Sequence, residues 1–127
     1  MNVIIFQNRF ESPIMDGVKN CTIRQRRKDG RPRAKEGEPV SLRVWTGAPY
    51  RSKQREFAQR TVKFTFPVRV SKNGIVRMDL GCQLSHKEMA RALGFESWRE
   101  ARRWYEAAHG LPFDGDLVHF PAANDRI

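Results

Sequence analysis

The chain has 127 residues, with 24 lysines and arginines against 14 aspartates and glutamates, and a formal net charge of +10. A mean hydropathy of −0.67 and 30% charged residues exclude a membrane protein, and no apolar run is long enough to span a bilayer. The length fits a single domain, which we place at residues 1–120 with a frayed tail at 121–127. The strong positive charge favours a polyanionic partner.

The apolar run at the N-terminus is too short for a signal peptide and carries no basic leader, so we expect a cytoplasmic protein. Cys21 and Cys82 are then expected to stay reduced and unpaired. The histidines, His86, His109 and His119, have no metal-ligand spacing. We therefore expect no metal and no cofactor.

In the N-terminal part of the chain, the apolar run at 3–6 predicts a short buried strand. Residues 10–17 predict a short helix, with Ser12 as its N-cap and Gly17 as its terminator. The next residues, 22–24, are expected to be extended. This places a helix directly before the most basic part of the chain.

The middle of the chain alternates polar loops with strands. Residues 25–38 are basic and rich in glycine and proline, which predicts a mobile loop, and 46–56 predict a second polar loop. Residues 39–45 predict a strand. Residues 61–70 show the clearest period of two, typical of a half-buried antiparallel strand, and Pro67 within it indicates a sheet edge or a bulge.

The C-terminal part predicts a hairpin, two helices and a closing strand. The turn signal at 73–74 predicts that residues 75–80 pair back on the preceding strand. Capping boxes at 85–88 and 97–100 begin two helices, and 117–120 reads as the last strand. An apolar stripe on the second helix contains Trp98, Ala101, Trp104, Tyr105 and Ala108. Together the elements predict a small α+β fold of about five to six mostly antiparallel strands, curled into a sheet or barrel, with three short helices.

A lysine, a hydroxyl and an arginine, namely Lys19, Thr22 and Arg24, lie close together after the predicted first helix. Between Lys19 and Lys35 there are eight basic residues and only one acid, Asp29. Such an array of donors suits an anion or a nucleic-acid backbone. The loop cations that we expect to capture phosphates are Arg26, Arg27, Lys28, Arg31 and Arg33. Singly, each member of the trio has an ordinary explanation: a solvated lysine, a strand threonine, an ion-paired arginine.

Residues 17–24 (GVKNCTIR) carry a G-x-K-x-x-T-x-R pattern, residues 37–42 read GEPVSL, and residues 90–95 read ARALGF before a tryptophan-containing helix. This combination resembles the ASCH domain family, which belongs to the PUA-like β-barrel superfamily. The resemblance covers nearly the whole chain. It implies a PUA-like fold and a role in RNA metabolism, with RNA or a modified nucleotide as the ligand.

One small ASCH branch hydrolyses N4-acetylcytidine to cytidine and acetate. By resemblance, Lys19 and Thr22 match the catalytic lysine and threonine of that branch, and Arg24 matches the arginine that closes its motif. The branch also uses a glutamate, at a position where this chain has Leu93, and Glu88 lies more than a helical turn away. Without that carboxylate the proton shuttle is missing, so we rank nucleic-acid or nucleotide binding first.

Two aromatic residues, Trp45 and Tyr50, are candidates for stacking against bases, with loop or core packing as their alternative. Besides the amidohydrolase, a ribonuclease acting through Lys19 and Arg24 stays open, although no histidine is close in sequence. A third alternative is a phage-type module that docks an acidic protein on its basic face. We expect a monomer and no membrane partner.

Overall fold

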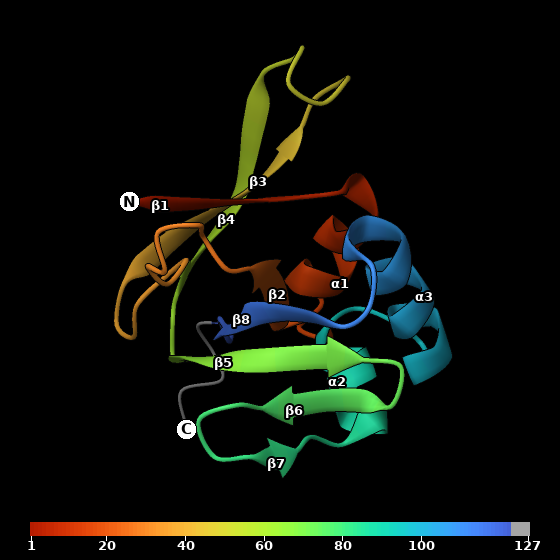
Figure 1. The fold of residues 1–127 in the computed structure, drawn as a ribbon. Coiled ribbons are helices and arrows are strands. Elements are labelled where there is room, and N and C mark those ends of the chain that lie inside the picture. The colour runs from red at the N-terminus through yellow and green to blue at the C-terminus, as the bar shows by residue number, and fades with distance from the viewer. Residues whose placement is uncertain (123–127) are drawn as a thin grey trace.

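The computed structural model describes residues 1–122 and shows an α+β fold with eight strands in two sheets over that part of the chain (Figure 1). The strands are β1 (Asn2–Phe6), β2 (Cys21–Gln25), β3 (Pro39–Trp45), β4 (Gln54–Thr61), β5 (Phe64–Ser71), β6 (Gly74–Arg77), β7 (Cys82–Gln83) and β8 (Phe113–His119). The helices are α1 (Glu11–Met15), α2 (His86–Ala92) and α3 (Trp98–His109), with a 3₁₀ turn η1 (Asn8–Phe10) before α1. The predicted frayed tail falls mostly on residues 123–127, which lie outside the described residues.

The strands form two separate sheets with the orders β1-β3-β4 and β2-β8-β5-β6-β7. The predicted α+β class and the three helices are confirmed, but more strands form than expected. Within residues 1–122 the sheets share no hydrogen-bonded neighbours, so no closed barrel is formed. β1 pairs with β3 in parallel, while the other strand pairs are antiparallel.

The alternating segment at 61–70 forms β5 as predicted, although the strand begins at Phe64. Its inner side chains at Phe66, Val68 and Val70 are buried, which is why this period of two fixes the strand's face. The expectation that Pro67 marks a sheet edge or a bulge is wrong, because β5 lies between β8 and β6 and its register with β8 runs through Pro67 without a shift. The Pro67 carbonyl accepts from Met78 N–H just beyond the last β5–β6 register pair. The N–H that proline lacks therefore removes only one hydrogen bond, at the end of that ladder.

Two strand boundaries differ from the prediction because they depend on partners distant in sequence. β4 occupies part of the predicted loop at 46–56, and its polar sequence has no period of two, so only pairing with β3 defines it. β8 begins at Phe113 rather than 117, because it lies between β2 and β5 and pairs with both of them. Residues 26–38 contain no helix or strand, which agrees with the predicted loop.

Both predicted capping boxes are confirmed: Ser85 accepts from Glu88 N–H, and Ser97 accepts from Glu100 N–H. The expected cap at Ser12 is wrong, because α1 already begins at Glu11 and no side chain caps it. The helices lie together on one side of the strands (Figure 1). Their buried side chains join both sheets in a single apolar cluster.

Candidate functional site

The segment that carries the predicted trio is fixed between α1 and α2. The chain leaves α1 at Gly17, whose φ of +80° suits glycine at this turn. The Lys19 N–H then donates to Pro13 O at 3.0 Å, and the Asn20 N–H donates to Ala92 O at 3.0 Å. β2 follows at once, so Thr22 and Arg24 leave the same face of one strand.

Lys19 is buried, with 3% of its surface exposed. Its Nζ donates to Cys21 O at 2.7 Å and to Leu93 O at 2.6 Å, and it lies 4.8 Å from the centre of the Phe10 ring. Burial, together with the nearby charge of Arg24, lowers the pKa of Lys19 to about 7. The amine is therefore neutral in a large fraction of molecules at neutral pH.

Arg24 lies beside Lys19 and is held by the rest of the fold. Its Nε donates to Thr22 Oγ1 at 3.2 Å, and its Nη2 donates to Ile5 O at 2.8 Å. The guanidinium carbon is 4.9 Å from the centre of the Phe6 ring. Burial lowers the pKa of Arg24 to about 10, so the group remains a cation at neutral pH. Among residues 1–122, Nη1 has no hydrogen-bond partner, which leaves its two N–H groups for a ligand.

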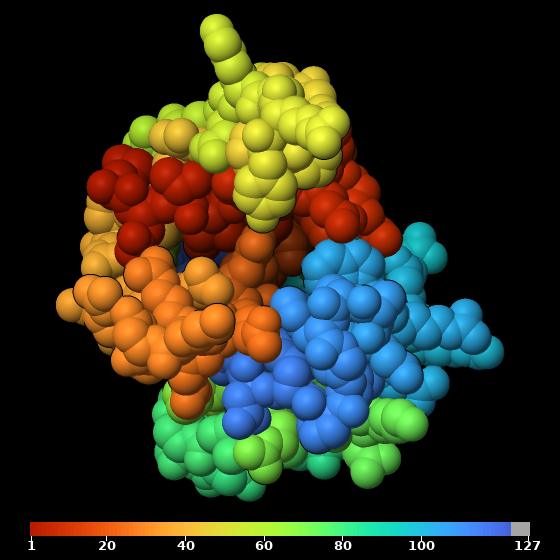
Figure 2. All heavy atoms as spheres, turned by 45° about the horizontal axis from the view of Figure 1, so that its top comes forward, coloured from red at the N-terminus to blue at the C-terminus, as the bar shows by residue number. Residues whose placement is uncertain are grey.

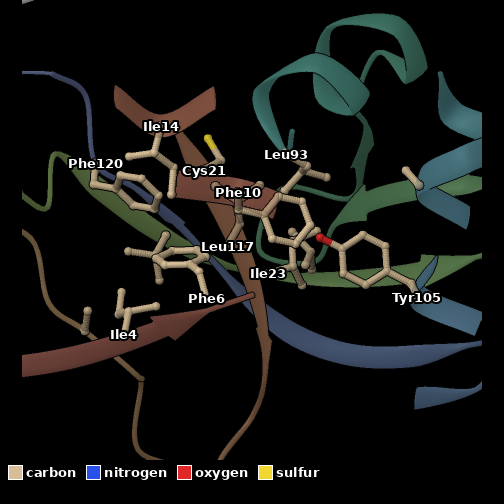
Figure 3. Packing of buried hydrophobic residues seen from close by; sticks show 14 of the residues in the cluster. Ile4, Phe6, Phe10, Ile14, Cys21, Ile23, Leu93, Tyr105, Leu117 and Phe120 are labelled. Atoms are coloured by element: carbon tan, nitrogen blue, oxygen red, sulfur yellow. The ribbon is translucent and has the colours of Figure 1, made fainter. Parts of the chain in front are cut away.

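The trio lines an inner cavity of about 390 Å³. Aromatic rings make up much of its wall: Phe6, Phe10, Phe95, Trp104 and Tyr105. Figure 3 shows the Tyr105 ring reaching from α3, with its hydroxyl oxygen pointing toward Phe10 and Ile23. The structure thus brings Lys19, Thr22 and Arg24 together, as the motif predicted, and places them within an aromatic enclosure.

An outer cavity of about 600 Å³ adjoins the inner one, and residues such as Arg24 and Arg33 line both. Trp45 and Tyr50, the predicted stacking residues, line the outer cavity with ring centres 5.3 Å apart. Tyr50 is 89% exposed, so its ring is open to a partner. In Figure 2 the orange segment, the red N-terminal strand and the blue C-terminal part of the chain surround a hollow.

The five basic residues of the loop differ in where they lie. Arg27 and Arg33 line the outer cavity, but Lys28 is exposed and lines neither cavity. Arg31 pairs with Asp29 at 2.8 Å. The loop therefore presents part of its charge directly to the cavities and the rest to solvent nearby.

Arg26 takes a different position, 3.4 Å from Oδ1 of Asp116 on β8. The Asp116 carboxylate is buried, and its Oδ2 has no hydrogen-bond partner among the described residues. Arg26 is thus partly neutralised, and no local sequence signal predicted this pairing between residues so distant along the chain.

Two residues that the sequence did not assign to the site also line the inner cavity, Tyr105 and His109. Tyr105 belonged to the predicted apolar stripe of α3, where its hydroxyl was the one signal of a further role. His109 ends the same helix, and partial burial lowers its pKa, with a smaller effect from Arg24. The ribonuclease alternative was limited by the lack of a nearby histidine, and the fold supplies one.

The glutamate that the resemblance to ASCH domains implies has no counterpart at this site. Leu93 is fully buried, and its backbone carbonyl accepts from Lys19. Glu88 is exposed at the start of α2, and none of the residues that line either cavity is acidic. The site thus has cations and aromatic rings but no carboxylate within the described part of the chain.

Among residues 1–122, no cluster of three or more histidine, cysteine or acidic side chains could hold a metal ion, and Cys21 and Cys82 are free thiols. No helix in that part of the chain has both the length and the apolar character needed to cross a bilayer. No family model, curated protein or solved structure matches this chain, so the functional argument depends on the geometry of the two cavities.

Proposed function

We propose that this protein binds single-stranded nucleic acid, with RNA favoured, by taking one unstacked base into the inner cavity. The observation that carries the proposal is the adjacency of the two cavities, which have Arg24 and Arg33 as shared lining residues. The inner cavity offers aromatic walls to a base, and the outer one offers cations and exposed rings to the adjoining nucleotides. Such a combination of a stacking platform and positive charge is typical of single-strand binding.

The charge of the site supports an anionic ligand. Lys19 is buried and Arg24 is half-buried, and no carboxylate lines the cavity that they share, although bringing like charges together out of water is unfavourable. A phosphate at the mouth would offset that repulsion and the charge of Arg27 and Arg33. The chain's net charge of +10 adds long-range attraction to any polyanion.

The shape of the site favours a single strand over a duplex. In a duplex each base is stacked and paired, so its edge is not free to enter an enclosed cavity without unpairing. A single strand can turn one base inward while its neighbours lie against Trp45 and Tyr50, the rings of the outer cavity. The preference for RNA comes from the resemblance of the Lys19, Thr22 and Arg24 motif to ASCH domains, and we include a PUA-like fold in the proposal.

The test compares two variants that each remove two positive charges. Arg27→Ala/Arg33→Ala removes cations that line the outer cavity, whereas Lys72→Ala/Lys87→Ala removes exposed lysines that line neither. Fluorescence anisotropy with a labelled single-stranded RNA should show about tenfold weaker binding for the first variant only. If both arginines contact phosphates, the slope of log affinity against log salt should also decrease in magnitude by about 1.4.

Equal losses in the two variants would contradict the proposal, because they would show that only net charge matters. Tighter binding to duplex than to a single strand would contradict it as well. Absence of binding to any nucleic acid by the folded protein would instead favour the docking of an acidic protein on the basic loop.

Amide hydrolysis is a second candidate, and the state of Lys19 is the observation that favours it. With a pKa of about 7, a neutral amine can donate both protons to Cys21 O and Leu93 O and keep its lone pair as a base. Thr22 lines the same cavity, and its hydroxyl would act as the nucleophile. The absence of a carboxylate from that cavity is why binding ranks above hydrolysis.

For this second candidate we expect the protein to release acetate from N4-acetylcytidine. The rate should be at least about tenfold lower in Lys19→Met, which removes the base, and unchanged in Lys87→Met at an exposed site. An enzymatic acetate assay measures both. No acetate release by the folded wild-type protein would eliminate amide hydrolysis of this substrate.

A further inference from the structure

We infer that the inner cavity selects uracil, a base with two carbonyl oxygens and one ring N–H, through hydrogen bonds from Arg24, Thr22 and Tyr105. The inference rests on the proposed function and makes it more specific, since it names the base that enters the cavity. It depends on polar groups that the protein leaves unpaired inside an enclosed space.

Tyr105 is the main observation. Only 2% of its surface is exposed, yet its hydroxyl has no hydrogen-bond partner among residues 1–122. The oxygen is not among the fully buried unpaired side-chain atoms, so it keeps some surface that is accessible from the inner cavity, which Tyr105 lines. The hydroxyl points away from α3 (Figure 3). A ligand that fills the cavity would cover this hydroxyl and is therefore expected to pair with it, because covering a hydroxyl without a partner is unfavourable.

Arg24 and Thr22 add donors to the same cavity. Nη1 of Arg24 keeps two unpaired N–H groups, and the Thr22 hydroxyl accepts from Arg24 and so keeps its own proton. No carboxylate is present to accept from a ligand. Gln7 and Gln25 contribute amides, which donate and accept alike and give no bias. Lys19 and His109 also line the cavity, and each can donate or accept according to its protonation state, so neither gives a fixed bias. The bias toward donors therefore comes from Arg24, Thr22 and Tyr105.

Matching these donors to the bases favours uracil. Its two carbonyl oxygens provide four lone pairs for Arg24, Thr22 and Tyr105, while its single N–H can be accepted by the Tyr105 oxygen. Cytosine has an amino group in place of one carbonyl and a bare ring nitrogen in place of the ring N–H, so it offers three lone pairs and two N–H groups. Adenine and guanine also carry an amino group, so each has a lower ratio of lone pairs to N–H groups than uracil. A carbonyl also directs its negative end toward the Arg24 cation, whereas an amino group directs its positive end there.

The walls indicate why the cavity takes a base rather than a phosphate. Phe10, Phe95 and Trp104 enclose it with apolar rings, which stack favourably on a planar base but do not replace the hydration of a phosphodiester anion. Phosphates are better placed outside, at Arg27 and Arg33. The base and the backbone therefore occupy different cavities.

The experiment measures anisotropy with two RNA probes of about ten nucleotides, an oligocytidine and the same strand with one central uridine. A single uridine matches a single cavity and avoids counting several binding registers. The wild-type protein should bind the uridine probe about tenfold more tightly, which corresponds to two well-formed hydrogen bonds to a base edge. A third probe carries 3-methyluridine, whose methyl group blocks that edge, and it should bind like oligocytidine.

The matched variants are Tyr105→Phe and Thr61→Val, each of which removes one hydroxyl; Thr61 is exposed and lines neither cavity. Tyr105→Phe keeps the ring in the core, and its hydroxyl has no protein partner to lose, so folding should be preserved. We expect Tyr105→Phe to reduce the uridine preference to about twofold or less, while Thr61→Val leaves the preference unchanged.

Equal binding of the uridine and cytidine probes by the wild type would overturn the inference while leaving the proposed function standing. Retention of the full preference in folded Tyr105→Phe, or with 3-methyluridine, would overturn it too. Absence of binding to every probe would remove both the inference and the proposed function.

Discussion

Raising the pH from about 7 to about 9 is expected to increase the free energy of unfolding of this protein by about 2 kcal/mol. The cause is Lys19, whose pKa is lowered from 10.5 to about 7 by burial and by Arg24. Between these two pKa values the unfolded chain binds a proton at this site that the folded chain does not bind. The free energy of unfolding therefore rises with pH between these two pKa values. The slope is about 1.4 kcal/mol per pH unit where Lys19 is fully protonated in the unfolded chain and fully neutral in the folded chain.

Other titratable groups define the limits of this window. Below it, His109 titrates with a lowered pKa and adds to the rise. Burial raises the pKa of Cys21 to about 12 from 9.0, so stability is lost as pH rises beyond the ordinary thiol value. Tyr105, whose pKa is also raised by burial, contributes in the same direction above about 10. Near pH 9 only the beginning of the thiol effect reduces the gain from Lys19.

Urea unfolding at several pH values measures the effect, with Lys19→Met and Lys87→Met as the matched pair. Methionine at position 19 keeps an unbranched side chain without the charge, so the rise should disappear, whereas the exposed Lys87 should not affect it. A flat or falling profile for the wild type, or an unchanged rise in Lys19→Met, would show that Lys19 keeps an ordinary pKa. An ordinary pKa would also exclude Lys19 as the base in amide hydrolysis, because the amine would then be protonated at neutral pH.

Local sequence signals predicted the parts of the fold that depend on local physics. The two capping boxes need only a hydroxyl and a glutamate three residues apart, and β5 needs only its own alternation. β4 has no such pattern, and β8 is defined by pairing with both β2 and β5. Pairing between distant strands depends on tertiary context, so these boundaries could not be read from local signals.

The candidate site divides in the same way. Lys19, Thr22 and Arg24 lie in one short segment, and a motif could indicate them together. Tyr105 was placed in the core by the period of its helix, and that placement is correct, but periodicity does not show that its hydroxyl meets a cavity. His109 lies at the end of α3, and only the fold brings it to the cavity that residues of β2 also line.

The basic loop shows a further limit of composition. Its charge predicted attraction for an anion, but the sequence alone could not distinguish the roles of its five cations. The fold distinguishes them: Arg33 lines both cavities, Arg26 pairs with the buried Asp116, and Arg31 pairs with Asp29. The geometry therefore limits the expected phosphate contacts to fewer residues, and it explains why the proposed test uses Arg27 and Arg33.

Replacing Gly115 by alanine is expected to destabilise the protein by about 2 kcal/mol and to lower its melting temperature by roughly 6 to 10 °C. Gly115 lies in β8 between β2 and β5, opposite Gln25 and Val68. A Cβ there would lie 2.6 Å from the backbone oxygen of Arg24 and 3.0 Å from Cγ2 of Ile23. A backbone oxygen in a paired strand cannot turn aside as a side chain can, so β2 must shift.

The shift would reach the candidate site, because β2 carries Arg24, whose guanidinium is held between Thr22 and Ile5. We therefore expect Gly115→Ala to weaken RNA binding even at temperatures where it remains folded. The control for stability is Gly47→Ala in an exposed loop, where the new Cβ would lie 3.3 Å from the Ser52 side chain and should change stability by less than about 0.5 kcal/mol. Gly47 lines the outer cavity, so binding is instead compared between Gly115→Ala and the wild type. Thermal unfolding of both variants, with anisotropy on Gly115→Ala and the wild type, separates the two effects. If Gly115→Ala lost stability but bound RNA as the wild type does, the position of Arg24 would not govern binding, and the inner cavity would have to be abandoned as the ligand site.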